Sequence, residues 1–285
     1  MKIFNIVVVA LSVFGMSAPT LADHHAGATG YALTSDGKTL VIMSDMAKPD
    51  VIKSYPLNNT LSAIAYRPVT GDLLGFGDGA VYTIDTTSGK TTSLNAKFIA
   101  DAGIGTNTAV GFDFNNKIDA VRAVSANGDN LVYFPVGFGG DDPKANSVRR
   151  FTTLAYAKGD TNAGTKPMIF ANAYTNAING KKAGSTFQYA LDANTDSLVS
   201  LANNAGTLST ISKVKINGKS TNITNMGGFD IVSHSEGENK AYAILQVEGQ
   251  DKAGLYVINL NTADASLITQ LGMGSIKSFA ASKTH

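Results

Sequence analysis

Asp23, His24 and His25 have the spacing of a square-planar metal site. If the chain is cleaved after Ala22, the new amino group, two backbone amides and the third-position imidazole could wrap Cu²⁺ or Ni²⁺, which favour that geometry. These residues therefore predict a copper or nickel site. Any third-position histidine creates the same motif, so a polar tail without a metal is the alternative.

A second possible metal site is the loop that carries Asp192, Asn194 and Asp196. Oxygen ligands at alternate positions of a tight loop suit a hard cation such as calcium. Ser197 stands where a helical calcium loop has glycine, and Asn203 stands where it has glutamate. The pattern predicts a calcium site, with a plain Asp/Asn turn as the alternative.

A third group of polar residues is expected at the mouth of a central channel, where it could hold a polar ligand. Four of these residues lie in or next to short strands of small residues, and two lie in a long connection at 158–168. The alternative is that they satisfy turns and neighbouring strands. The six residues are Arg67, Asp113, Asp160, Asn162, Asn172 and Asp230.

Classical catalytic groups are scarce in this chain. It contains four histidines and no cysteine, which excludes thiol catalysis and leaves His234 almost alone for a histidine-based mechanism. Phosphate-binding and nucleophile-elbow motifs are absent from the sequence. A non-enzymatic binding or scaffold protein with an unknown small-molecule or protein ligand is therefore the leading hypothesis. A calcium-dependent hydrolase or lactonase is an alternative, as is a periplasmic metal-binding protein that uses the Asp-His-His site.

The elements that would position these residues are predicted from an internal repeat. A short strand of small residues ending in an aromatic residue occurs five times, with the aromatic residues 46 to 62 positions apart. Blades of four strands take about 40–50 residues in propeller families. The sequence therefore predicts an all-β fold, a β-propeller of five four-stranded blades, with a β-sandwich or β-solenoid as alternatives. The aromatic residues are Tyr66, Phe112, Tyr174, Phe229 and Phe279.

The last copy of the repeat, at 275–281, is too near the end of the chain for three more strands. Strand-like segments at 30–33, 39–43 and 51–55 could supply them. We therefore expect the last blade to be closed by both termini, which would remove exposed sheet edges.

Residues 1–22 resemble a cleavable secretory signal, with Lys2 before an apolar run and small residues before Asp23. The expected organisation is a signal at 1–22, a flexible tail at 23–29 and one propeller domain at 30–285. The signal holds one of the 23 basic residues and none of the 22 acidic ones, so the processed chain would be neutral. We therefore expect an exported, monomeric protein without nucleic-acid partners or a membrane span.

Several phrases of the chain resemble the secreted bacterial proteins of domain-of-unknown-function family 4394. The resemblance extends from about Gly30 to Phe279 and implies a propeller-like, exported protein, but no activity. The phrases are YALT at 31–34, AYRPVTG at 65–71, VYTID at 81–85, GFDFN at 111–115, LAYAKGDTNAG at 154–164, AYTN at 173–176, NAGTL at 204–208 and GGFD at 227–230.

Overall fold

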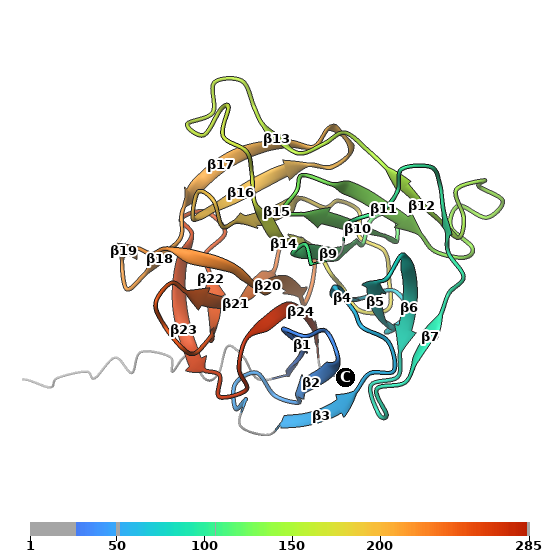
Figure 1. Cartoon of the computed structure of the whole chain (residues 1–285), viewed down its shortest axis with the longest axis horizontal. Coiled ribbons are helices and arrows are strands. Elements are labelled where there is room, and N and C mark those ends of the chain that lie inside the picture. The colour runs from blue at the N-terminus through green and yellow to red at the C-terminus, as the bar shows by residue number, and fades with distance from the viewer. Residues whose placement is uncertain (1–26, 50–51, 106, 284–285) are drawn as a thin grey trace, which may run out of the picture.

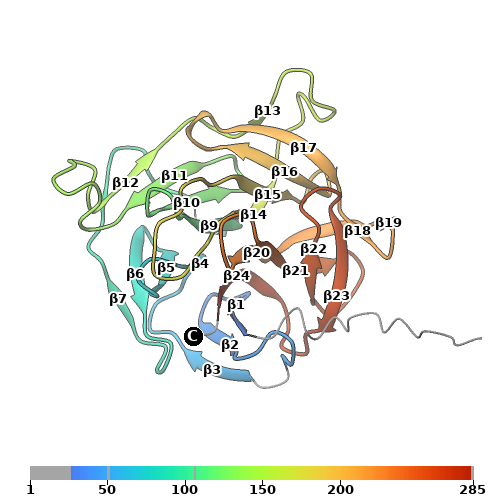
Figure 2. The ribbon, with the colours of Figure 1, turned by 180° about the vertical axis from the view of Figure 1, so that it is seen from behind.

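Five short strands of small and aromatic residues surround the axis of the molecule, and each is the inner strand of a separate sheet (Figures 1 and 2). The structure is a computed structural model that describes residues 27–49, 52–105 and 107–283. The predicted five-bladed propeller is confirmed, which excludes the sandwich and the solenoid. The inner strands are β4 (Ala63–Tyr66), β9 (Val110–Asn115), β14 (Ile169–Tyr174), β20 (Ile223–Ser233) and β24 (Ile276–Lys283).

Outside each inner strand, three antiparallel strands complete the blade. We number the blades 1 to 5 by their inner strands in chain order. Blade 1 adds β5 (Leu73–Gly77), β6 (Ala80–Ile84) and β7 (Thr91–Ser93); blade 2 adds β10 (Ala120–Ser125), β11 (Asn130–Phe134) and β12 (Ser147–Arg150); blade 3 adds β15 (Gln188–Asp192), β16 (Ser197–Ala202) and β17 (Thr207–Lys213); blade 4 adds β21 (Asn239–Val247), β22 (Gly254–Ile258) and β23 (Asp264–Gln270); blade 5 adds β1 (Ala28–Thr34), β2 (Thr39–Met43) and β3 (Ile52–Pro56).

The expectation of four strands in every blade is wrong for blades 2, 3 and 4, whose sheets have five, five and six strands. In each, the chain arriving from the preceding blade pairs in parallel with the outermost long strand before it turns to the axis. This pairing covers an edge that would otherwise expose unpaired backbone groups. The added strands are β8 (Lys97–Phe98), β13 (Ala155–Tyr156), β18 (Lys215–Ile216) and β19 (Lys219–Ser220), and a short 3-10 helix spans Asn203–Ala205.

Blade 5 combines the two ends of the described chain. Its inner strand β24 pairs antiparallel with β1, with Gly30 opposite Ala281 and Ala32 opposite Phe279. Strand β1 begins at Ala28, two residues before the expected start of the domain. Because the first and last blades are then neighbours, the ring has no open edge between them.

Small residues in the inner strands allow adjacent blades to approach closely. A Cβ atom on Gly111 would lie 2.7 Å from the backbone of Ala171 and Asn172 in the next blade. A Cβ on Gly228 would lie 2.3 Å from the backbone nitrogen of Phe279. Neither space would accommodate even alanine, so the crowding around the axis explains why the repeat begins with small side chains.

The hydrophobic core lies between the blades. One cluster of buried residues joins blades 1 and 2, and includes Phe76, Phe112 and Phe114. Four further clusters fill the other junctions around the ring. Each blade is therefore stabilised mainly by apolar burial against its two neighbours.

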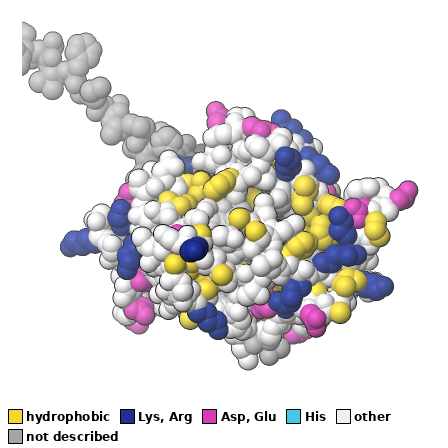
Figure 3. Space-filling view, turned by 90° about the horizontal axis from the view of Figure 1, so that it is seen from above, with side chains coloured by type: hydrophobic (Ala, Val, Ile, Leu, Met, Phe, Trp, Pro, Cys, Tyr) yellow, Lys and Arg dark blue, Asp and Glu magenta, His cyan; other side chains and the backbone are white. Residues whose placement is uncertain are grey.

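The surface carries both signs of charge. Seen edge-on, lysine and arginine side chains are interspersed with aspartate and glutamate, and hydrophobic side chains occur in small groups (Figure 3). Within the part of the chain that the structure describes, no helix is long and apolar enough to cross a membrane.

Candidate functional site

One end of the axial channel is covered by the loop 175–187, which joins β14 to β15 in blade 3. We call this loop the plug. The inner strands end at this side of the molecule, which we therefore call the carboxyl end of the channel. The backbone N–H of Gly180 donates to the carbonyl of Pro68 at 2.8 Å, in blade 1. Asn179 Nδ2 donates to the carbonyl of Lys283 at 3.1 Å, in blade 5.

The plug is also bonded to blades 2 and 4. Asn116, from the β9–β10 turn, donates through Nδ2 to the carbonyls of Asn176 at 2.7 Å and Lys181 at 3.2 Å. The backbone N–H of Asn176 donates to Oδ1 of Asn239 at 2.7 Å. A loop of one blade thus contacts the other four, and it closes the carboxyl end of the channel.

We expect Asn116→Ala to lower the free energy of unfolding by about 1–3 kcal/mol, because the plug then loses both hydrogen bonds that the buried Asn116 side chain donates to it. Asn116 is fully buried, so water cannot readily replace the lost bonds. Urea unfolding of the variant measures the loss. Lys117→Ala is the control, since Lys117 is the exposed neighbour in the same turn. Equal losses in the two variants would contradict the assigned role of Asn116.

Two buried carboxylates connect inner strands of neighbouring blades. Asp113 of β9 accepts a bond through Oδ2 from the backbone N–H of Tyr174 in β14, at 2.7 Å. Asp230 of β20 accepts one through Oδ2 from the backbone N–H of Ala281 in β24, at 2.6 Å. No further strand pairs with the axial edge of β14 or β24. The two carboxylates therefore accept hydrogen bonds from backbone N–H groups that would otherwise have no partner there.

Burial raises the pKa of both carboxyls. Removal from water raises the pKa of Asp230 to about 7. Asp113 is raised well above its ordinary pKa by burial and, second, by the negative charge of Asp230. Both line a small hollow beneath the plug, together with Ala177 and Asn179. These two expected site residues therefore do come together, but at the closed end of the channel.

Arg67 and Asn172 have structural surroundings. Arg67 forms a two-pronged ion pair with Asp119, at 2.8 Å through Nε and 2.5 Å through Nη2, and joins blade 1 to blade 2. Its guanidinium also lies 5.9 Å from the ring centre of Phe114. Asn172 is buried at the junction of blades 2 and 3, next to Gly111, and its amide has no hydrogen-bond partner among the described residues.

Asp160 and Asn162 lie away from the channel. Asp160 accepts a bond through Oδ2 from the backbone N–H of Thr210 at 2.7 Å, and Asn162 Nδ2 donates to Thr210 Oγ1 at 2.9 Å. Thr210 belongs to β17, the fourth strand from the axis in blade 3. The first part of the connection 158–168 therefore lies along the outer part of blade 3. The expected grouping of all six residues at one mouth does not form.

The side chains of the predicted calcium loop are directed to different partners. Asp192 accepts bonds from the Tyr156 hydroxyl at 2.5 Å and the backbone N–H of Met168 at 3.0 Å. Asp196 accepts a bond from the N–H of Ile223 at 2.9 Å, and Asn194 Nδ2 donates to the carbonyl of Lys166 at 2.9 Å.

These contacts are those of an Asp/Asn turn that satisfies its own surroundings, the alternative for this loop. Among the described residues, no three His, Cys, Asp or Glu side chains are grouped closely enough to hold a metal ion. The predicted calcium site therefore has no support from the geometry. Asp23, His24 and His25 lie outside the described residues, and their copper or nickel site stays a prediction.

Two adjoining depressions lie at the other end of the channel, where the inner strands begin. We call this the amino end. The first, of about 420 Å³, contains residues just before β4 and the start of β24, including Ser62 and Lys277. The second, of about 380 Å³, contains residues at the starts of β9, β14 and β20, including Met168 and Asn225. Together they border all five inner strands and share Asn107 as a lining residue.

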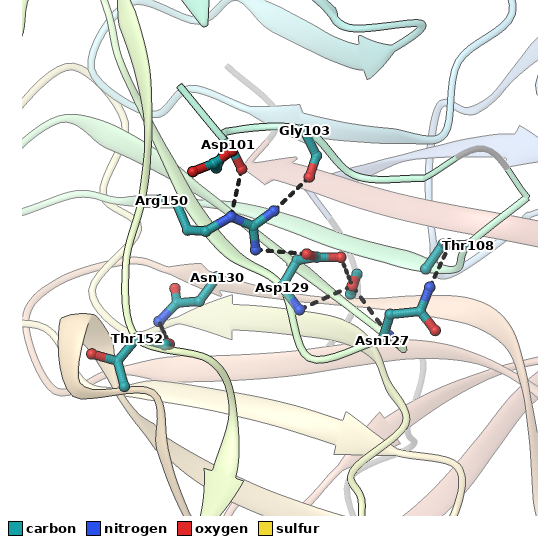
Figure 4. Close-up of polar contacts among 9 residues, drawn as sticks. Asp101, Gly103, Thr108, Asn127, Asp129, Asn130, Arg150 and Thr152 are labelled. Atoms are coloured by element: carbon teal, nitrogen blue, oxygen red, sulfur yellow. Dashed lines mark hydrogen bonds and ion pairs between the residues drawn. The ribbon is translucent and has the colours of Figure 1, made fainter. Parts of the chain in front are cut away.

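Arg150 of β12 fixes the connection that separates these depressions (Figure 4). Its guanidinium donates to the carbonyl of Asp101 at 2.5 Å and that of Gly103 at 2.7 Å. A third bond, of 2.7 Å, joins it to the carboxylate of Asp129, and holds the guanidinium between loop and blade. The loop is therefore preorganised by one side chain from the outermost long strand of blade 2.

Sequence reasoning placed long connections at the channel mouth but missed most of the residues that line it. The connection 158–168 was expected there, and its last part, with Lys166 and Met168, does line the second depression. Lys277 and Asn225 could not be recognised as lining residues from the sequence, because each is a single polar residue at the beginning of a strand. The plug was also missed, since its bonds join residues up to about a hundred positions apart.

The fold and its channel define a five-bladed β-propeller that is closed at its carboxyl end and hollowed at its amino end. The chain belongs to the family described as Domain of unknown function (DUF4394), whose model matches residues 41–280. The resemblance seen in the sequence is thereby confirmed. No curated protein matches the chain.

Solved structures from Bacteroides are similar to this chain at low identity. A protein of unknown function from Bacteroides caccae has 10% identity and a TM-score of 0.43, over 90% of this chain and 99% of its own. An auxiliary nutrient binding protein from Bacteroides thetaiotaomicron has 12% identity and a TM-score of 0.43, over 75% of this chain and 55% of its own. An auxiliary nutrient binding protein from Bacteroides ovatus has 11% identity and a TM-score of 0.42, over 74% of this chain and 52% of its own. This chain spans about half the length of the two nutrient binding proteins.

Proposed function

We propose that this protein is an exported, non-enzymatic binding protein that holds a polar ligand at the amino end of its channel. The observation that carries the proposal is the pair of depressions bordered by all five inner strands. The plug closes the opposite end, so the axis is approached from the amino end. Export rests on the signal-like residues 1–22.

The lining of the depressions indicates the chemistry of the ligand. Asn107, Asn127 and Asn225 each present a carboxamide, which both donates and accepts hydrogen bonds. Lys166 and Lys277 add two cations, and no described carboxylate lies within 4.0 Å of either ammonium group. The carboxylates of Asp36 and Asp78 also line the first depression. Amides and charges of both signs around an open hollow suit a hydroxyl-rich or amide-rich ligand such as an oligosaccharide or a short peptide.

Arg150 contributes by holding the loop between the depressions before the ligand arrives. A preorganised loop binds more tightly, because less conformational entropy is lost on binding. The positions of Asp101 and Gly103 relative to blade 2 depend on that guanidinium.

The test uses processed protein recovered from an expressing bacterium. Gluco-, xylo- and mannotetraose and a trialanine peptide are screened by thermal shift, and any binder is then titrated by calorimetry. We expect at least one probe to bind, and Asn225→Ala to weaken it by about tenfold, the loss of a hydrogen bond to a buried ligand. Asn58→Ala, in the β3–β4 connection outside both depressions, is the control for nonspecific effects.

Three outcomes would overturn the proposal: no binding by any probe, equal loss of affinity in Asn58→Ala and Asn225→Ala, or catalytic turnover of the probe. Arg150→Leu gives a further readout. It should weaken binding with a smaller association rate constant, because the loop then samples conformations that cannot bind.

A further inference from the structure

A groove of about 650 Å³ lies between blades 3 and 4, apart from the two depressions at the amino end. Blade 3 contributes Tyr189 of β15, and blade 4 contributes residues of β21, β22 and β23, including Lys240 and Asp264. The groove also includes Thr175 and Gly237, which lie where the inner strands of the two blades finish. It shares no lining residue with either depression.

One aromatic residue, Tyr189, lines the groove. Its ring is packed edge to face against Phe187, with ring centres 4.8 Å apart at an angle of 60°. Phe187 is 51% exposed, which is unusual for so large an apolar side chain. The hydroxyl of Tyr189 has no hydrogen bond within the described chain, and burial raises its pKa, so it is a neutral donor.

Lys240 lines the same groove and has no counter-ion. Its ammonium forms no ion pair or hydrogen bond with any residue that the structure describes. Burial lowers the pKa of Lys240, because partial removal from water disfavours the charged ammonium. Asp264 lines the groove too, but its carboxylate accepts a bond from the Thr262 hydroxyl at 2.5 Å and lies beyond 4.0 Å from Lys240.

Several other polar groups of the groove are already used by the fold. Asn239 Oδ1 accepts a bond from the backbone N–H of Asn176 at 2.7 Å. Asn259 Oδ1 accepts one from the N–H of Asn261 at 2.9 Å, within the β22–β23 turn. The groups left for a ligand include the Lys240 ammonium and the Tyr189 hydroxyl. The side chains of Asn261 and Ser266 and the second carboxylate oxygen of Asp264 are also free of hydrogen bonds within the described chain.

We propose that this groove binds a carboxylate-bearing sugar, that is, a uronate. Its carboxylate would pair with Lys240, and the apolar face of its ring would stack against Tyr189. A half-buried ammonium without a partner gains most from a ligand that brings the opposite charge, because the cost of its desolvation is already met in the free protein. The proposal is independent of ligand binding at the amino end.

The test is titration calorimetry with digalacturonate as the acidic probe and galactobiose as its neutral analogue. We expect digalacturonate to bind and the neutral disaccharide to bind at least about tenfold more weakly, since one charge-assisted hydrogen bond is lost. Raising NaCl from 0.05 to 0.5 M should weaken the acidic probe, because salt screens the ion pair.

Charge-matched variants locate the site. Lys240→Gln should weaken digalacturonate about tenfold or more, and Lys240→Arg should retain most of the affinity. Lys252→Gln removes the same charge from the exposed β21–β22 turn and should have no effect. Thermal unfolding of each variant shows that it is folded.

The proposal is overturned if digalacturonate gives no heat at millimolar concentration, if galactobiose binds equally well, or if Lys240→Gln and Lys252→Gln behave alike. Binding of benzoate in preference to digalacturonate would also overturn it, because the carboxylate would then be attached to an aromatic ring rather than a sugar. Asn225→Ala at the amino end should leave digalacturonate binding unchanged. Failure of this proposal is thereby distinguished from failure of the proposed function.

Discussion

Replacing Arg122 by leucine is expected to lower the free energy of unfolding by about 3–5 kcal/mol, because it removes three hydrogen bonds from a charged donor, each worth about 1.5–3 kcal/mol before the lower desolvation cost of leucine is counted. Arg122 is 4% exposed and lies at the junction of blades 2 and 3. Its guanidinium donates to the hydroxyl of Tyr174 and to Oδ1 of Asn204, both at 2.8 Å, and also to Oδ1 of Asn130. Leucine would remove the donor from the fully buried Tyr174 hydroxyl and Asn130 side chain, which water reaches poorly, and from the exposed Asn204. Urea unfolding measures the loss.

Two comparisons separate this network from simple loss of charge. Arg122→Lys keeps the charge, but one ammonium cannot reproduce three bonds in a plane, so we expect a smaller loss that is still measurable. Arg150→Leu also removes three bonds, but the Arg150 side chain is 31% exposed and water can replace them. A loss in Arg150→Leu as large as that in Arg122→Leu would contradict the role given to burial.

The second large effect is a fall in stability as the pH rises from about 4 to about 7. Asp230 titrates near 7 in the folded chain, against an ordinary value of 3.8, and Asp113 is raised in the same direction. Between pH 3.8 and about 7 the folded state binds more protons than the unfolded state, so the free energy of unfolding decreases as the pH rises. The slope is about 1.4 kcal/mol per pH unit for each proton. The contribution is fully present below pH 3.8 and is lost as the pH passes 7.

Asp230→Asn should flatten this profile, because the amide does not ionise. It should also lower the stability at every pH. The backbone N–H groups of Ile231 and Ala281 both donate to the Asp230 carboxylate, and in the variant one of them faces an amide NH₂ instead of an oxygen. Urea unfolding at several pH values between 4 and 8 measures both effects. Asp251→Asn, on the exposed β21–β22 turn, should keep the slope of the unaltered protein. An unchanged slope in Asp230→Asn would refute the assignment of the raised pKa to the channel.

Short-range patterns were sufficient to predict the five inner strands. The alternation of small and aromatic residues and the glycine or asparagine turns act over a few residues, so they can be read along the chain. Phe112 and Phe229 are buried at blade junctions as the repeat requires. The added strands β8, β13, β18 and β19 were not predictable, because two residues carry no periodicity.

The candidate sites were predictable only in part. Asp113 and Asp230 were recognised as inner-strand residues, and they do share one hollow. Their role depends on the plug, whose bonds to Pro68 and Lys283 join distant parts of the chain. No local pattern contains that information.

Residue types and spacing alone thus determine which segments pair into strands, how many blades form and where glycine must stand. The tertiary structure decides which end of the channel is closed, which carboxyls are removed from water and which cations lie in hollows without a counter-ion. Lys240 illustrates the difference. In the sequence it is one lysine in a strand, and only the packing of blade 3 against blade 4 places it in a groove beside Tyr189. The reason is physical: strand pairing follows from local geometry, whereas burial and charge compensation depend on neighbours that the fold alone brings together.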